Sequence, residues 1–126
     1  MERRHVLAVN GDADFLDLVR ELLQDEQYNV TTTNYVERTH DVITALAPDL
    51  VILDLVYGQP AGWDLLAELA EAAATRDIPV LVTSTNRDLL AEAVADPARY
   101  GTVRDLVKPF DIDVLLATVR ELIGGA

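Results

Sequence analysis

Several short apolar segments of the sequence end in side chains that could do chemistry. Asp54, Ser84 and Lys108 each stand at the end of such a segment, and Asn10-Gly11-Asp12 follows another. A carboxylate can act as a nucleophile and form a covalent intermediate. An ammonium and a hydroxyl can bind anionic oxygens. An acid, a hydroxyl and an ammonium are therefore the candidate functional groups, provided that the fold brings them together.

The apolar segments have strand length and alternate with stretches of helical pattern. They are Val6 to Val9, Tyr28 to Thr33, Leu50 to Leu55, Ile78 to Thr83 and Thr102 to Val107. Three of them are rich in Val, Ile and Leu without polar alternation, as in strands covered on both faces of a parallel sheet. Five βα units predict an α/β fold with a doubly wound five-stranded parallel sheet. Ligands bind such sheets at the carboxyl ends of the strands, where the candidate side chains stand.

The expected helices lie between these segments. Phe15, Leu18, Val19, Leu22 and Leu23 have the spacing of one helix face. The same spacing recurs at Leu115, Thr118, Val119, Leu122 and Ile123. Further helices are expected over 62–74 and, with weaker patterns, over 36–46 and 88–95, whereas residues 96–101 read as a turn-rich connection.

Composition excludes several classes of protein. The 126 residues are expected to form a single domain, residues 1–126, because roughly 100 to 200 residues make one domain. The net charge of -12 repels phosphate backbones and anionic membranes, so neither nucleic acid nor membrane is an expected partner. Zero cysteines exclude thiol chemistry. The sequence shows neither a membrane-spanning apolar run nor a signal peptide, which predicts a cytoplasmic protein.

The order of the polar groups resembles the receiver domain of bacterial response regulators over nearly the whole chain. Asp54 stands where that family carries the Asp that accepts a phosphoryl group from a histidine kinase, eight residues before Gly62 as in its D-x-x-x-P-x-x-D-G loop. Ser84 stands at the Ser/Thr position, and Lys108-Pro109-Phe110 matches the family's K-P-F. Lys108 is also the only lysine of the chain.

The resemblance implies a fold and a set of roles. The fold is the flavodoxin-like strand order 2-1-3-4-5. Asp54 is the implied phosphoacceptor, and Ser84 and Lys108 are the implied groups that contact the phosphoryl group and switch with it. The peptide bond between Lys108 and Pro109 is implied to be cis.

The implied metal site is incomplete in this sequence. Receivers carry an acidic pair at the end of the first strand, which holds Mg²⁺ together with the phosphoacceptor. Alignment on the first helix puts Asn10 and Gly11 at that pair, and Asp12, one position later, reads foremost as the helix N-cap. Because Mg²⁺ commonly takes one or two carboxylates, waters and substrate oxygens, Asp54, Asp12 and the Val56 carbonyl would bind it only weakly.

Three further positions depart from the family pattern. Gly58 and Ala61 replace the Pro and Asp of the loop after the phosphoacceptor, and Asp105 occupies the aromatic switch position three residues before Lys108. An Asp cannot make the ring swing that reports phosphorylation. The segment from Ser84 to Lys108 is also two residues longer than is common, which leaves the placement of the fourth helix open.

Two functions remain open. One is a stand-alone receiver that takes a phosphoryl group on Asp54 from a histidine kinase or phosphotransfer protein and signals to a downstream protein partner. The other is an unphosphorylated pseudo-receiver, a docking module that could form a homodimer through its fourth and fifth helices. Asp54, Ser84 and Lys108 favour the first function, whereas the missing acidic pair and Asp105 favour the second.

Enzyme functions fit the sequence less well. Asp12-Ala13-Asp14 has the D-x-D form of haloacid-dehalogenase-like phosphatases, but Asn10 and Gly11 separate it from the first strand, and the chain lacks the length for a cap domain. A flavodoxin-type flavin site needs a first loop suited to phosphate, and this one is acidic. The chain is therefore not expected to be an enzyme.

Overall fold

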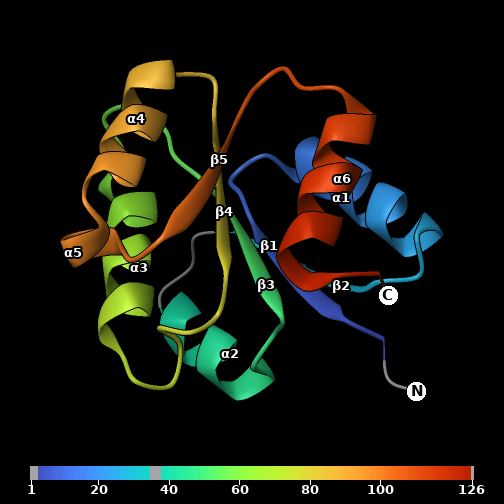
Figure 1. The fold of residues 1–126 in the computed structure, drawn as a ribbon, viewed down its shortest axis with the longest axis horizontal. Coiled ribbons are helices and arrows are strands. Elements are labelled where there is room, and N and C mark those ends of the chain that lie inside the picture. The colour runs from blue at the N-terminus through green and yellow to red at the C-terminus, as the bar shows by residue number, and fades with distance from the viewer. Residues whose placement is uncertain (1–2, 35–37, 126) are drawn as a thin grey trace.

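The computed structural model describes residues 3–34 and 38–125 of the chain. Strands and helices alternate along this part of the sequence (Figure 1). The strands are β1 (His5–Val9), β2 (Asn29–Thr33), β3 (Leu50–Asp54), β4 (Val80–Ser84) and β5 (Val103–Val107). The helices are α1 (Ala13–Asp25), α2 (Thr39–Leu46), α3 (Pro60–Glu71), α4 (Arg87–Ala95), α5 (Pro97–Tyr100) and α6 (Ile112–Ile123).

The strands form one parallel sheet in the order β2-β1-β3-β4-β5. This confirms the predicted doubly wound fold and its flavodoxin-like strand order. The chain runs from β1 to β2 on one side and then returns to pair β3 with the other side of β1. The strand order thus reverses at β1 and β3, so the crevice at the carboxyl ends of these strands is the expected ligand site.

Helices cover both faces of the sheet (Figure 1). Successive strand residues point to opposite faces. Val6 and Ala8 pack against α1 and α6, while Leu7 and Val9 belong to the core beneath α2, α3, α4 and α5. Strands covered in this way on both faces explain the continuous apolar runs of the sequence.

The face of α1 that packs against the sheet differs from the face that the apolar spacing predicts. Its buried residues are Leu16, Val19 and Leu23. Leu18, predicted on the buried face, is 46% exposed, so that prediction is wrong. The i, i+3, i+7 line through Leu16, Val19 and Leu23 faces the sheet and turns Leu18 toward solvent. In α6, by contrast, the predicted Leu115, Thr118 and Val119 are the buried residues.

The remaining helices match their predictions in place and differ at their ends. Helix α2 begins at Thr39, and residues 36 and 37 of the prediction lie outside the described residues. Helix α3 begins two residues before its predicted start, because Pro60 suits the first turn of a helix. It ends at Glu71 rather than at residue 74.

The connection after α4 contains a short helix that the sequence does not predict. Residues 97–100 form α5, and the Asp96 side chain accepts a hydrogen bond from the backbone N–H of Arg99 at 3.2 Å. The Tyr100 ring packs against Trp63 of α3, with 5.2 Å between ring centroids. This helical turn connects α4 to β5. Among the described residues, no helix is long and apolar enough to cross a membrane.

Candidate functional site

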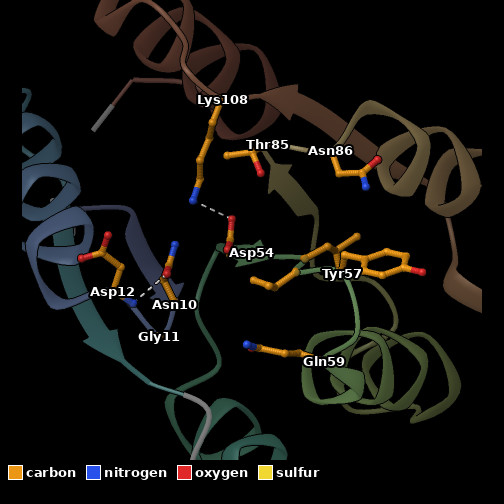
Figure 2. Close-up of a pocket in the computed structure, with 11 residues that line it drawn as sticks. Asn10, Gly11, Asp12, Asp54, Tyr57, Gln59, Thr85, Asn86 and Lys108 are labelled. Carbon is orange, nitrogen blue, oxygen red and sulfur yellow. Dashed lines mark hydrogen bonds and ion pairs between the residues drawn. The ribbon is translucent and has the colours of Figure 1, made fainter.

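A pocket of about 590 Å³ opens at the carboxyl ends of the strands. The loops after β1, β3, β4 and β5 all contribute to it (Figure 2). Its lining residues are Asn10, Gly11, Asp12, Asp54, Leu55, Val56, Tyr57, Gln59, Thr85, Asn86 and Lys108. The predicted strand-end residues therefore meet where the strand order reverses, with the exception of Ser84, which lies beneath the surface.

Asp54 and Lys108 form the central contact of the pocket. Asp54 is the last residue of β3 and is 6% exposed, and Lys108 directly follows β5. The Lys108 Nζ atom lies 2.7 Å from Asp54 Oδ1 (Figure 2). The same Nζ atom lies 4.1 Å from the centroid of the Phe15 ring, a cation–π contact from the side of α1. The expected meeting of the carboxylate and the sole ammonium is confirmed, and so is the cis bond between Lys108 and Pro109.

Thr83, and not Ser84, provides the hydroxyl bonded to Asp54. Thr83 Oγ1 donates to Asp54 Oδ1 at 2.8 Å. Ser84 is buried with its hydroxyl turned elsewhere: Oγ donates to the Leu55 carbonyl at 2.7 Å and accepts from the backbone N–H of Asn86 at 3.1 Å. Strand register explains the difference, because Thr83 is directly paired with Asp54 across β3 and β4.

Asp12 and Asn10 organise the loop after β1. Asp12 Oδ1 accepts hydrogen bonds from the backbone N–H groups of Asp14 and Phe15 at 3.0 and 3.3 Å. This confirms Asp12 as the N-cap of α1. Asn10 is 4% exposed, and its Oδ1 accepts from the Asp12 backbone N–H at 2.9 Å. Its Nδ2 atom is buried and has no hydrogen-bond partner within residues 3–34 and 38–125, an arrangement that typically costs about 1 to 3 kcal/mol.

The donor set around the pocket does not fit Mg²⁺ in the way that two adjacent carboxylates would. Asp12 Oδ1 caps α1, and the Val56 carbonyl accepts a hydrogen bond from the Gln59 backbone N–H at 3.1 Å. Asn10 presents an N–H group, which repels a cation. In the part of the chain that the structure describes, no three His, Cys, Asp or Glu side chains are grouped to hold a metal ion.

The position expected for an aromatic switch lies on β5. Asp105 pairs with Val82 of β4 and is exposed. Tyr100 lies instead in the buried contact with Trp63. The structure thus puts a solvated carboxylate at position 105 and a fixed ring in the connection that precedes β5.

Sequence reasoning missed several residues of the site. Thr85 and Asn86 line the pocket after β4, and Asn86 caps α4 by accepting from the backbone N–H groups of Asp88 and Leu89. Tyr57 stands at the pocket with 80% of its surface exposed (Figure 2). Thr83 was missed because its pairing with Asp54 depends on strand register, and the loop residues carry no sequence signal either.

Comparison with known proteins decides the family. Residues 6–120 match the response regulator receiver domain. The chain belongs to this family. Receiver domains are signalling modules of two-component systems rather than catalytic enzymes, and they imply a histidine kinase as partner. Receiver domains typically bind Mg²⁺.

Curated relatives of this receiver include the transcriptional regulatory protein KdpE of Staphylococcus aureus, which is 28% identical over 91% of the chain. The alginate biosynthesis transcriptional regulatory protein AlgB of Pseudomonas putida is 30% identical over 93% of it. The chain spans 48% of the length of KdpE and 25% of AlgB.

Solved structures match nearly the whole chain. The chemotaxis protein CheY4 of Vibrio cholerae has a TM-score of 0.82 at 22% identity, and the match covers 96% of this chain and 99% of CheY4. A response regulator protein of Burkholderia multivorans has a TM-score of 0.74 at 29% identity, with 99% and 98% covered. The likeness to CheY4 shows the fold, which is the sheet order found above.

Proposed function

We propose that this receiver accepts a phosphoryl group on Asp54 and signals through protein contacts in the cytoplasm. The observation that carries the proposal is the 2.7 Å contact between Lys108 Nζ and Asp54 Oδ1 inside the pocket. It joins a nearly buried carboxylate to the only lysine of the chain at the carboxyl end of the sheet. Such a pair can balance the charge that phosphoryl transfer brings to the carboxylate.

The chemistry is a transfer between an imidazole and a carboxylate. A carboxylate oxygen of Asp54 attacks the phosphorus of a phosphohistidine, an O–P bond forms and the P–N bond breaks. The electron pair of the broken bond leaves with the imidazole, which takes a proton from solvent. Lys108 then contacts an oxygen of the bound phosphoryl group by a charge-assisted hydrogen bond.

Ser84 is proposed to respond to this event. Its hydroxyl now connects the Leu55 carbonyl to the backbone N–H of Asn86, the N-cap of α4. If the phosphoryl group draws this hydroxyl away, both partners lose a hydrogen bond, and the start of α4 changes its environment. With an exposed Asp at position 105 in place of an aromatic ring, the signal would pass through the β4–α4 loop.

A degenerate acidic pair is part of the proposal. Asn10 and Gly11 follow β1 and line the pocket, where carboxylates would bind Mg²⁺. With Asp54, Asp12 and the Val56 carbonyl as remaining oxygen ligands, Mg²⁺ would bind weakly, and phosphorylation would depend on it less than in other receivers.

The proposed partners are proteins. A histidine kinase or phosphotransfer protein supplies the phosphoryl group, and a downstream protein reads the modified surface. Nucleic acid and membranes are not proposed as partners, since the net charge of -12 repels polyanions.

Mass measurement tests the acceptor role. The protein is incubated with acetyl phosphate, with Mg²⁺ or with EDTA, and its intact mass is determined. We expect one added phosphoryl group on the wild type and none on Asp54→Asn. The exposed α3 residue Asp64 provides a matched control, because Asp64→Asn makes the same chemical change and should leave the modification intact. An unmodified wild type under all conditions would contradict the proposal.

A second candidate function is a phosphorylation-independent docking module. It is favoured by exposed apolar side chains on the two helices expected to dimerise, α4 and the expected fifth helix, which is α6 in the structure. Val94 of α4 is 46% exposed, and Ile112 and Val114 of α6 are 48% and 45% exposed. Sedimentation equilibrium on the untreated protein distinguishes this candidate. A dimer that is lost in Val94→Asp, combined with no added mass from acetyl phosphate, would favour it over the acceptor.

A further inference from the structure

The side-chain amide of Asn10 has a fixed orientation in the pocket. Its Oδ1 accepts the hydrogen bond of the Asp12 backbone N–H at 2.9 Å. Exchanging the oxygen and nitrogen would bring two donors together, so this contact determines which atom faces the pocket. Figure 2 shows the amide nitrogen pointing toward the region of Asp54 and Lys108. The amide therefore presents its N–H groups, and not its oxygen, to the phosphoacceptor.

This donor is buried and unused. Asn10 is 4% exposed, and its Nδ2 atom finds no acceptor among the residues that the structure describes. Buried polar atoms are almost always hydrogen-bonded, and the exceptions often mark a functional site. An acceptor that enters the pocket would satisfy Nδ2, whereas a cation would be repelled by it.

The pocket holds a single lysine, Lys108, beside the carboxylates of Asp12 and Asp54. Lys108 Nζ is the cation of the pocket and is shared between Asp54 Oδ1 and the Phe15 ring. A phosphoryl group adds about 1.5 to 2 negative charges and three acceptor oxygens. The single positive charge of Lys108 cannot neutralise both the phosphoryl group and the carboxylates that line the pocket. An N–H donor opposite the lysine supplies further stabilisation without a metal ion.

We propose that Asn10 Nδ2 donates a hydrogen bond to an oxygen of the phosphoryl group on Asp54, in place of the metal ion that an acidic pair would hold. The inference rests on the proposed acceptor role of Asp54. Its consequence is that the site takes and keeps a phosphoryl group without a divalent cation. In the transfer from acetyl phosphate, an Asp54 oxygen bonds to phosphorus, the P–O bond to acetate breaks, and acetate leaves with the electron pair. No proton has to move.

The test compares modification by acetyl phosphate in EDTA and in Mg²⁺, followed by intact mass. We expect the wild type to be modified in EDTA at a rate within about threefold of that in Mg²⁺. Asn10→Asp keeps the acceptor for the Asp12 N–H but loses the donor, so its rate in EDTA should fall at least tenfold and recover in Mg²⁺. Asn29→Asp, at the exposed start of β2, adds the same charge at the far end of the sheet and should behave as wild type.

A second variant separates the loss of the donor from the added charge. Asn10→Ala removes the amide without creating a carboxylate, and it should also lose modification in EDTA by at least tenfold. An Asn10→Ala protein modified at the wild-type rate would overturn the inference. A wild type modified only in Mg²⁺ would overturn it as well, while leaving the acceptor role intact. A wild type unmodified in both buffers would refute the acceptor role itself, and the inference with it.

Nuclear magnetic resonance reports the contact directly. On modification in EDTA, the ¹⁵N–¹H resonances of the Asn10 side chain, assigned by their absence in Asn10→Asp, should shift toward those of a hydrogen-bonded amide. The side-chain resonances of Asn29 should stay in place. Unmoved Asn10 resonances in a fully modified protein would overturn the inference.

Discussion

The polar groups on the two sides of the pocket, here called the β1 wall and the β3–β5 wall, differ in the partners that they bind. The β1 wall, made of Asn10, Gly11 and Asp12, has a carboxylate committed to a helix cap and an amide nitrogen without an acceptor in the described part of the chain. On the β3–β5 wall, made of Asp54, Thr83 and Lys108, the carboxylate is held by an ammonium and a hydroxyl at 2.7 and 2.8 Å. The carboxylate of the β3–β5 wall therefore has its partners within the protein, whereas the β1 wall keeps a buried donor, Asn10 Nδ2, without one among the described residues.

The two walls therefore differ in the groups that they offer to a ligand. Holding a nucleophilic carboxylate requires a cation and a hydrogen-bond donor beside it, and the β3–β5 wall supplies both. Binding Mg²⁺ requires further oxygen ligands, and the β1 wall presents an N–H group instead. The proposed acceptor chemistry depends on the β3–β5 wall, whereas metal binding would also need oxygen ligands from the β1 wall.

The largest expected effect comes from removing the cation of the β3–β5 wall. Lys108→Met leaves the Asp54 carboxylate nearly buried without its ion pair, which should lower the free energy of unfolding by about 2 kcal/mol or more. Urea unfolding measures the change. Arg104→Met is the control: its ion pair with Glu121 is exposed, so its loss should cost less than about 1 kcal/mol. Equal losses would mean that the burial of the Asp54–Lys108 pair adds no stability.

The hydroxyl of the same wall should have a smaller effect. Thr83→Val keeps the shape of the side chain but removes the donor to Asp54 Oδ1, at a cost of about 1.5 kcal/mol for a hydrogen bond to a charged group. Urea unfolding again provides the measurement. Thr85→Val, at an exposed position of the same strand end, should stay within about 0.5 kcal/mol of the wild type. A harmless Thr83→Val would show that Lys108 alone holds the carboxylate.

Restoring carboxylates to the β1 wall should change metal binding. Asn10→Asp combined with Gly11→Asp adds two oxygen ligands beside Asp54, and an added Cβ at Gly11 meets no atom within 4 Å. We expect the affinity for Mg²⁺, measured by calorimetry, to rise at least tenfold, or about 1.4 kcal/mol. No gain would show that these positions do not correspond to the acidic pair.

The smallest expected effect concerns the cap of α1. Asp12→Ala removes the acceptor for the Asp14 and Phe15 N–H groups and should cost about 1 kcal/mol, whereas Asp12→Asn keeps an acceptor and should cost only a few tenths. Thermal unfolding measures both. If Asp12→Asn also weakened Mg²⁺ binding strongly, Asp12 would be a metal ligand, and the β1 wall would be less incomplete than its contacts indicate.

Much of the fold could be predicted because it rests on hydrophobic burial. Strands covered on both faces need uninterrupted apolar residues, and these marked three of the five segments. The rotation of α1 could not be predicted, since two overlapping sets of leucines satisfy the helical period, and only contact with the sheet selects Leu16 over Leu18. Helix α5 was missed because its single turn depends on the Asp96 cap and on the packing of Tyr100 against Trp63.

For the site, the sequence by itself determined which chemical groups are available: one lysine, a strand-end aspartate, and no carboxylate at positions 10 and 11. It also determined that they stand at the same end of a parallel sheet, because all strands run in one direction. Only the tertiary structure decided that Thr83 rather than Ser84 bonds to Asp54, and that the Asn10 amide nitrogen points toward the region of Asp54 and Lys108. Strand register and the orientation of an amide are set by contacts between distant segments, and no local pattern of residues encodes them.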